Sequence, residues 1–359
     1  VIFTGGGEPL KNQYTIPGMK WAKEHGLSVG LFTNGFLLTE EVASKIAQIN
    51  PTFIRISLNA GSPEAYRLSY GLSRKENYLQ MVLGNIEYIA RAKQQSLASP
   101  DKRFHLDIGV LITPFNIGDL AEIAFQLKRI ALRYRGTINN IAFRPAVNYG
   151  RDWYGMSEDA MRDAETLLKT FPFVEGVDLV SMLRNFIQNG MQLPEQAITY
   201  ADNIIRTQLK PILLAGDDDG TINVSLPSER LFNVSQNVHP QRCLAYPLVV
   251  FIGPDTSVYH CVERALDPNM SYGKLSEASL KELWESPKRK DIMSKLGGSI
   301  ESECPPVCLL YEYNKVFNAI QASLKDNTTS ERCKNNIDLA QQRFKDVIAP
   351  RIGEVVNFI

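Results

Sequence analysis

Four of the five cysteines lie in a pattern that could bind a metal. Cys243 and Cys261 are separated by seventeen residues with a Gly-Pro-Asp turn midway, and Cys304 and Cys308 follow as Cys-Pro-Pro-Val-Cys. The two prolines exclude a regular helix between the second pair. Four thiolates can hold a tetrahedral zinc ion or an iron–sulfur cluster, and the spacing does not decide between them. The alternative is four buried, inert thiols.

A glycine-rich segment near the amino end offers a different chemistry. Gly5, Gly6 and Gly7 end an apolar stretch that opens at Val1, and Glu8 follows them directly. Glycines leave the backbone amides and carbonyls without neighbouring β-carbons, so a ligand can approach the main chain closely. The Glu8 carboxylate is suited to bind a ligand ammonium group. We therefore predict a ligand site at the end of the first strand.

Alternating strand and helix patterns over residues 1–145 would position this segment. We expect strands at residues 1–4, 29–33, 53–58, 104–112 and 138–143, with the first buried. We expect helices at residues 16–24, 39–49, 77–94 and 120–134, the second of them capped by Thr39. Strands that alternate with helices indicate parallel βα units joined by right-handed crossovers.

Polar residues recur where these strands end, which favours a barrel over a doubly wound sheet. They are Glu8, Asn34, Ser57, Asn59, Thr113, Asn116 and Arg144. A TIM-type barrel gathers its active site at that end of its strands. The sequence also lacks the G-x-G-x-x-G spacing and distant acid of a dinucleotide fold. The predicted class is α/β, a partial (β/α)6 TIM-like barrel with a small α+β cysteine-rich domain at the carboxyl end.

The remaining segments are less regular. We expect helices at residues 157–170 and 179–190, and an acidic turn at residues 216–220 that forms the tip of a hairpin before residues 222–224. That turn lacks the rest of an EF-hand pattern. In the cysteine-rich part we expect a hairpin of residues 249–252 and 257–259 and a helix at residues 279–284. Long helices at residues 309–324 and 330–348 would close the chain.

Composition excludes several classes of protein. Lys plus Arg and Asp plus Glu both number 39, so no net field attracts nucleic acid or an anionic membrane. No apolar run is long enough to span a bilayer, and no signal peptide is recognisable at the amino end. We expect a cytoplasmic protein. The odd number of cysteines favours metal ligation or reduced thiols over a disulfide framework.

The order of these motifs resembles that of radical S-adenosylmethionine enzymes. The resemblance rests on residues 5–9 (GGGEP), on residues 33–35 (TNG) and on residues 56–61 (ISLNAG). The segment from Cys243 to Cys308, with the stretch YGKLSEASLKELW, resembles the auxiliary-cluster module of the twitch or SPASM type. With two cysteines on each side of the helix, it is closer to the shorter twitch form.

This resemblance implies roles for individual residues. Gly5, Gly6, Gly7 and Glu8 would bind the methionine amino group of S-adenosylmethionine, and Ser57 and Asn59 would contact its ribose or carboxylate. Asn34, Thr113, Asn116 and Arg144 would line the cofactor and substrate side. Cys243, Cys261, Cys304 and Cys308 would ligate every iron of an auxiliary [4Fe–4S] cluster. Cys333 would be a hydrogen-atom donor or an exposed thiol.

One departure from the family concerns its C-x3-C-x2-C loop, which holds a second [4Fe–4S] cluster. None of the five cysteines has that spacing. We expect the loop, with the first βα unit of the barrel, to lie upstream of Val1. The expected domains are a barrel (residues 1–150), a bridging or substrate region (151–242), an auxiliary-cluster domain (243–312) and terminal helices (313–359).

The implied activity is cleavage of S-adenosylmethionine to a 5′-deoxyadenosyl radical, which abstracts hydrogen from a peptide or protein. Oxidation, cross-linking or epimerisation would follow, with flavodoxin or ferredoxin as electron donor. An aminocyclitol or sugar is the alternative substrate. The rival of another class is a zinc-stabilised binding protein without catalytic activity. A TIM-barrel lyase or aldolase is disfavoured because no lysine or metal-binding set occurs at the strand ends.

Overall fold

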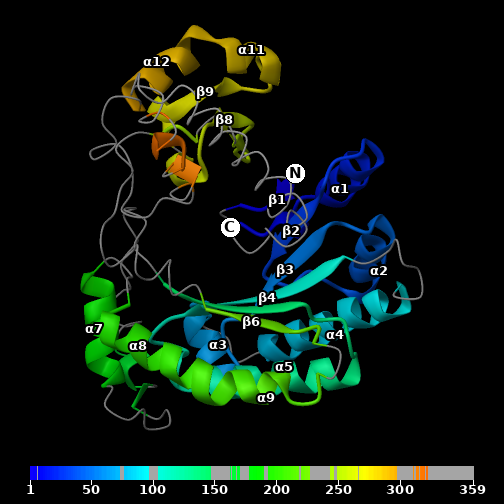
Figure 1. Cartoon of the computed structure of the whole chain (residues 1–359), viewed down its shortest axis with the longest axis vertical. Coiled ribbons are helices and arrows are strands. Elements are labelled where there is room, and N and C mark those ends of the chain that lie inside the picture. The colour runs from blue at the N-terminus through cyan, green and yellow to red at the C-terminus, as the bar shows by residue number, and fades with distance from the viewer. Residues whose placement is uncertain are drawn as a thin grey trace, which may run out of the picture. The chain divides into compact units, whose positions relative to one another are not determined.

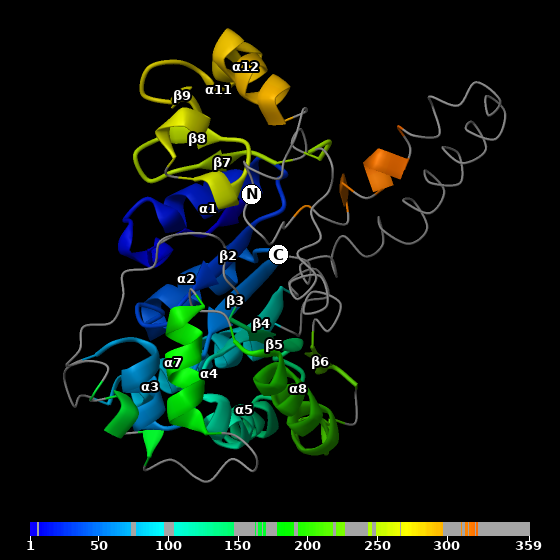
Figure 2. The same cartoon turned by 90° about the vertical axis from the view of Figure 1, so that its left-hand side faces the viewer.

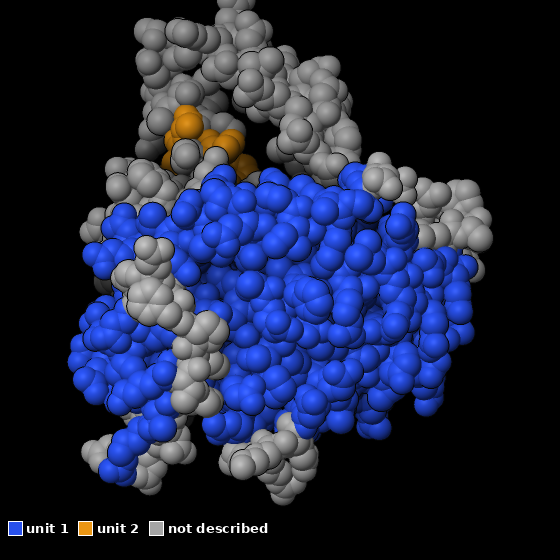
Figure 3. All heavy atoms as spheres, turned by 90° about the horizontal axis from the view of Figure 1, so that it is seen from below, with its two compact units in different colours: residues 1–148, 152–235 blue, residues 149–151, 236–359 orange. Residues whose placement is uncertain are grey.

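The chain divides into two compact units, which Figure 3 colours separately. Unit 1 comprises residues 1–148 and 152–235, and unit 2 comprises residues 149–151 and 236–359. The computed structural model describes residues 1–5, 7–72, 77–96, 104–146, 162, 164–166, 168–169, 178–189, 193–217, 220–226, 243–245, 249–265, 267–296, 310, 313–314, 316–319 and 321. Each unit is described by itself below.

Unit 1 is built on one parallel sheet whose strands follow each other in chain order (Figure 1). Its strands are β1 (Ile2–Phe3), β2 (Gly30–Thr33), β3 (Phe53–Ser57), β4 (His105–Ile112), β5 (Asn140–Pro145) and β6 (Asn223–Ser225). Every neighbouring pair is parallel, and β1 and β6 form the two edges. The open, parallel sheet confirms the predicted partial barrel. The first strand is half-buried rather than buried, because it lies at an edge.

Helices cover one face of this sheet, as Figures 1 and 2 show. They are α1 (Thr15–Glu24), α2 (Glu40–Ile49), α3 (Pro63–Ser69), α4 (Tyr78–Ser96) and α5 (Leu120–Arg133), with the 3-10 turns η1 (Pro9–Lys11) and η2 (Ile117–Asp119). The Thr39 hydroxyl accepts a hydrogen bond from the Val42 amide, which confirms the predicted cap of α2. Sequence reasoning missed α3, whose seven residues are too few to show a helical period.

The two faces of the sheet differ in chemistry because side chains alternate along each strand. The face under the helices is apolar and contains Leu31, Ile54, Ile56, Leu106, Ile108, Val110, Ile141 and Phe143. The opposite face carries a row of aligned residues, Phe32, Arg55, Asp107, Asn140 and Asn223, one from each of β2 to β6. The sheet therefore buries an apolar core on one side, while the row on the other side is polar and largely buried at its centre.

Charged groups in the polar row are paired. The Arg55 guanidinium lies 3.4 Å from the Asp107 carboxylate and 5.1 Å from the centre of the Phe32 ring. Asn140 Oδ1 accepts hydrogen bonds from Asn223 Nδ2 and Ser225 Oγ, both at 3.2 Å. Burial raises the pKa of Asp107, and the Arg55 charge opposes that rise. Without Arg55, the buried Asp107 would keep the weaker influence of the His105 and Lys93 charges.

The acidic turn at residues 216–220 corrects one prediction. It is not a hairpin tip, because β6 pairs with β5 in the parallel sense. The Asp217 carboxylate accepts hydrogen bonds from the Thr221 hydroxyl and the Ile222 amide, both at 2.8 Å, and so shapes a connection between a helix and a strand. That connection was misread because Asp- and Gly-rich turns look alike in a sequence whether a helix or a strand precedes them.

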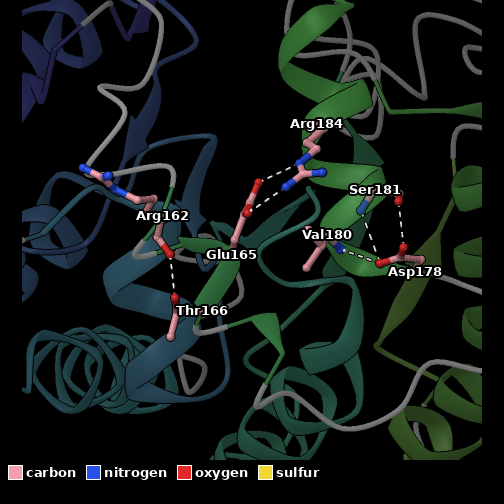
Figure 4. Close-up of polar contacts among 7 residues, drawn as sticks. All are labelled: Arg162, Glu165, Thr166, Asp178, Val180, Ser181 and Arg184. Carbon is pink, nitrogen blue, oxygen red and sulfur yellow. Dashed lines mark hydrogen bonds and ion pairs between the residues drawn. The ribbon is translucent and has the colours of Figure 1, made fainter.

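Further helices of unit 1 precede β6. They are α7 (Leu179–Gln188), α8 (Glu195–Ile204), the π-helical turn η3 (Ile205–Leu209) and α9 (Lys210–Leu214). Figure 4 shows Arg184 of α7 holding Glu165 through Nε and Nη2, at 2.7 and 3.0 Å. The Asp178 carboxylate caps α7 by accepting from the amides of Val180 and Ser181. Residues 152–235 thus belong to the same unit as the sheet.

Unit 2 contains a small antiparallel sheet and short helices. Its strands are β7 (Phe251–Ile252), β8 (Ser257–Tyr259) and β9 (Ser271–Lys274), so the predicted hairpin is confirmed. The 3-10 turns η5 (Val262–Arg264) and η6 (Pro268–Met270) precede α11 (Leu280–Glu285) and α12 (Pro287–Leu296). Ser279 and Glu282 form a capping box at α11. Where residues of the predicted helix at 309–324 are described, residues 313–314, 316–319 and 321 are helical, and the predicted helix at 330–348 lies outside the described residues.

Across the described parts of both units, no helix is both long and apolar enough to cross a bilayer.

The buried Lys93 should make the free energy of unfolding depend on pH. Lys93 of α4 is 2% exposed and donates to the Thr137 carbonyl at 2.7 Å and to Asn139 Oδ1. Burial lowers the pKa of Lys93 to about 7, while the Asp107 charge opposes this. Between that pH and about 10.4, the usual lysine pKa, the unfolded chain binds more protons, so the free energy of unfolding should rise with pH.

We expect wild type to gain roughly 1–2 kcal/mol relative to Lys93→Met between pH 7 and pH 9, measured by urea unfolding. Lys45→Met, which removes an exposed lysine, serves as the control and should show no such difference. Parallel pH profiles for wild type and Lys93→Met would contradict the assignment.

Candidate functional site

The Glu8 carboxylate fastens the glycine-rich loop to the end of β2. Its Oε1 accepts from the Leu10 amide at 3.0 Å and from the Thr33 hydroxyl at 2.7 Å, and its Oε2 accepts from the Asn34 amide at 2.8 Å. A carboxylate has about four lone-pair positions, so three of them are used inside the chain. Glu8 thus holds the loop in place, and its predicted contact with a ligand ammonium stays a prediction.

The turn after β2 is shaped to receive this carboxylate. The Thr33 hydroxyl donates to Glu8 and accepts from the Gly35 amide at 3.0 Å, and Asn34 Oδ1 accepts from the Phe36 amide at 2.9 Å. Gly35 has a φ of +77°, which favours glycine. Sequence reasoning had not assigned a role to Thr33, although its position before Asn34-Gly35 at a strand end was visible.

Gly5 and Gly7 have no structural reason to be glycine. Neither has a φ in the left-handed region, and a β-carbon at Gly7 would meet nothing within 4 Å. A β-carbon at Gly5 would come no closer than 3.8 Å to its nearest neighbour, an ordinary contact. At Gly61, by contrast, a β-carbon would lie 2.3 Å from the Ile123 amide nitrogen. Both loop glycines are exposed, so their bare backbone is open to a ligand.

Two asparagines join the ends of β3 and β4. Asn116 is completely buried, and its Nδ2 donates to the carbonyls of Asn59 and Leu111 at 2.9 and 2.7 Å. Its Oδ1 accepts from the Thr113 amide at 2.8 Å. Asn59 Oδ1 accepts from the Leu111 amide at 2.9 Å. These side chains hold the strand ends together, so a direct ligand contact by Asn116 would require one of these bonds to break.

Asp119 adds hydrogen bonds to the loop after β3. It is buried, and its Oδ2 accepts from the amides of Gly61 and Ser62 at 2.6 and 3.0 Å. Burial raises the pKa of Asp119, and the two amide donors counteract that rise. Sequence reasoning missed Asp119, because a single acid at the start of a helix reads as an ordinary cap.

Ser57 and Arg144 lie on neighbouring parts of the polar face. Ser57 belongs to a row of small residues that are aligned across β3 to β6, namely Ser57, Gly109, Ala142 and Ser225. Arg144 is aligned with Leu111 in the next row toward the strand ends. Both predicted site residues are half-buried. A β-carbon at Gly109 would lie 3.5 Å from Cδ of Arg55, so the Arg55 side chain reaches over this row of small residues.

Two of the predicted metal ligands lie in the described part of unit 2. Cys243 is buried and Cys261 is half-buried at the start of η5. Cys304, Cys308 and Cys333 lie outside the described residues. No group of three metal-binding side chains occurs among the residues that the structure describes. The four-thiolate set is therefore still a prediction.

The surroundings of these cysteines fit an anionic group with sulfur acceptors. His260, next to Cys261, is 2% exposed, and its Nδ1 has no hydrogen-bond partner within the described part of the chain. Burial lowers the pKa of His260 to about 4, and the charges of Arg264 and Arg289 add to this. The Asn314 amide nitrogen lies 3.8 Å from the Cys243 sulfur. Cations and N–H donors of this kind suit thiolates bound to a metal or cluster.

Comparison with known proteins identifies the second unit. Residues 243–346 match the SPASM family, an iron–sulfur cluster-binding domain, and the matched segment includes Cys333. The chain is also 30% identical over 126 residues to the uncharacterized protein MJ0804 of Methanocaldococcus jannaschii, a match that spans 35% of this chain. The chain covers 39% of the length of that relative.

Solved structures identify the fold. The histidine-tagged form of anSMEcpe with bound AdoMet matches 94% of this chain and 83% of its own, with a TM-score of 0.50 and 13% identity. Streptococcus suis SuiB bound to S-adenosylmethionine is a more distant match, with a TM-score of 0.46 and 11% identity over 80% of this chain and 55% of its own. Together, the match of residues 243–346 to the SPASM family and this shared fold agree with the resemblance that the sequence shows.

The hydrogen bonds of Asn116 predict how its removal changes the free energy of unfolding. Asn116→Ala removes a fully buried amide that donates to the Asn59 and Leu111 carbonyls and accepts from the Thr113 amide, so the free energy of unfolding should fall by about 1–3 kcal/mol. Asn203→Ala, an exposed asparagine of α8, is the matched control and should change it by less than about 0.5 kcal/mol. Equal effects in chemical denaturation would contradict the role assigned to Asn116.

Proposed function

We propose that this protein is a radical S-adenosylmethionine enzyme. The observation that carries the proposal is the open backbone at Gly5 and Gly7, where neither backbone conformation nor packing against described atoms requires glycine. A residue without a side chain at such a position is explained by close approach of a ligand to the main chain. The AdoMet bound to anSMEcpe suggests which ligand to test first.

Each residue of the loop would have a distinct task. An ammonium group has only donors, so the carbonyls of Gly5, Gly6 and Gly7 would accept from the methionine amino group. Glu8 would add negative charge there, while Thr33 and Asn34 keep its carboxylate in place. The ligand ammonium thus meets acceptors whose positions are fixed before binding, which limits the entropy lost on binding.

The neighbouring strand ends would form the rest of the site. Ser57 and Arg144, both half-buried on the polar face, would contact cofactor or substrate. Asn59, Thr113 and Asn116 would act through the loops that they position. When bound, S-adenosylmethionine and a reduced [4Fe–4S] cluster supply a 5′-deoxyadenosyl radical that abstracts hydrogen from the substrate. The protein contributes orientation and exclusion of water.

The proposal requires two clusters. Cys243, Cys261, Cys304 and Cys308 would ligate an auxiliary [4Fe–4S] cluster, and a C-x3-C-x2-C segment, a spacing that none of the five cysteines has, would hold the other. Ligation of every iron leaves no open position for substrate, so we assign the auxiliary site to electron transfer. That assignment favours oxidation or cross-link formation, with flavodoxin or ferredoxin as the external donor.

A peptide or protein is the proposed substrate, with an aminocyclitol or sugar as the alternative. The preference for a peptide rests on the SPASM-type domain, which in the family that the sequence resembles often accompanies action on peptides. If Cys333 donates a hydrogen atom, the product would be an epimer instead. The cytoplasmic location stays a prediction from the sequence.

Glycine-to-alanine variants of the full-length protein test the proposal. Gly5→Ala and Gly7→Ala place a methyl group where the ligand should lie, so the affinity for S-adenosylmethionine should fall at least about tenfold by calorimetry. Their free energies of unfolding should stay within about 0.5 kcal/mol of wild type, because an added β-carbon meets no described atom within 4 Å at Gly7 and makes only ordinary contacts at Gly5.

The matched control is Gly84→Ala, a glycine of α4 where an added β-carbon also meets nothing within 4 Å. It should bind the nucleotide as wild type does. Unchanged affinity in both loop variants would overturn the proposed binding site.

A further inference from the structure

We propose that Asn314 is a positioning residue for the iron–sulfur site of unit 2. It holds the Cys243 loop and donates an N–H to the Cys243 sulfur, which favours the reduced form of the bound cluster. This inference rests on the proposed auxiliary cluster and adds a residue that the cysteine pattern does not reveal.

The geometry of the Asn314 side chain is fully specified. Its Oδ1 accepts from the amides of Leu244 and Ala245, at 2.6 and 2.9 Å, and its Nδ2 lies 3.8 Å from Cys243 Sγ. Backbone amides can only donate, so the atom that faces them must be the oxygen. The nitrogen must therefore face the sulfur, and the ambiguity that usually affects an asparagine amide does not arise.

Burial and helix contacts fix this arrangement. Asn314 is 0% exposed. Its backbone N–H donates to the Leu310 carbonyl at 2.8 Å, and its backbone carbonyl accepts from Asn318 Nδ2 at 2.8 Å. Asn314 lies 71 residues from Cys243 in the sequence. A buried amide that uses both of its ends on one short segment ties that segment to the helix. The first predicted ligand is thus positioned by a residue beyond the last cysteine of the Cys304–Cys308 pair.

The electronic effect follows from the same contact. A hydrogen bond to a ligating thiolate stabilises negative charge, and reduction adds negative charge to the cluster. Asn314 should therefore raise the reduction potential, as outer hydrogen bonds to metal ligands do. Such a site is suited to accept an electron.

Two aspartate variants of the full-length protein test this role. Asn314→Asp keeps the oxygen that accepts from Leu244 and Ala245 but removes the N–H that faces Cys243. Asn318→Asp makes the same chemical change one helical turn further on. Iron and sulfide content are measured first, and the midpoint potential of the signal that disappears in Cys243→Ala is then measured by titration with electron paramagnetic resonance detection.

We expect Asn314→Asp to shift the reduction equilibrium toward the oxidised form by roughly tenfold more than Asn318→Asp does, which is about 59 mV for a one-electron couple. Selective loss of iron from Asn314→Asp would also support the inference if the two variants unfold at the same denaturant concentration, because Asn314 is fully buried whereas Asn318 is half-buried.

Equal potentials in the two aspartate variants, with iron retained, would overturn the inference and leave the proposed cluster standing. Two results would overturn both the role of Asn314 and the proposed cluster. One is that the wild-type protein binds zinc, and the other is that Cys243→Ala loses no metal relative to wild type.

Discussion

The fold of the candidate site depends on one carboxylate. Glu8 accepts three hydrogen bonds, from Leu10, Thr33 and Asn34, and so joins the loop after β1 to the turn after β2. β1 has only two residues and lies at the edge of the sheet, so its pairing alone would hold the loop weakly. The carboxylate compensates for this, and it leaves the backbone at Gly5 and Gly7 open because it takes its donors from other residues.

The same principle recurs wherever a functional segment meets the scaffold. Asn116 and Asp119 bind backbone groups of the loops after β3 and β4, and Asn314 binds the segment that follows Cys243. Each is a buried polar side chain that bonds at least one backbone group distant in sequence. Such contacts are costly to break in a buried environment, so they fix the positions of exposed residues that have few contacts of their own.

Much of the fold could be predicted from the sequence, because apolar periodicity and capping residues are local signals. The five strands up to residue 145, the cap at Thr39 and the hairpin before Cys261 were predicted in this way. β6 was misread because its partner, β5, lies 83 residues away for the pair Asn140 and Asn223. The roles of Asn116, Asp119 and Asn314 were missed or misassigned for the same reason, since their partners are set by tertiary structure. The order of the motifs located the glycine-rich loop. It did not show that the backbone at Gly5 and Gly7 is exposed without a structural need for glycine.

Amide hydrogen exchange tests the central claim most directly, because it observes the glycine backbone itself. Amide exchange of the full-length protein would be measured in the presence and absence of S-adenosylmethionine, without oxygen and without a reductant, so that the clusters stay intact and the nucleotide is not cleaved. We expect the nucleotide to slow exchange across residues 5–8, with little change in the solvent-facing helix α2. Identical exchange of residues 5–8 with and without saturating nucleotide would contradict the claim that this open backbone is the binding surface.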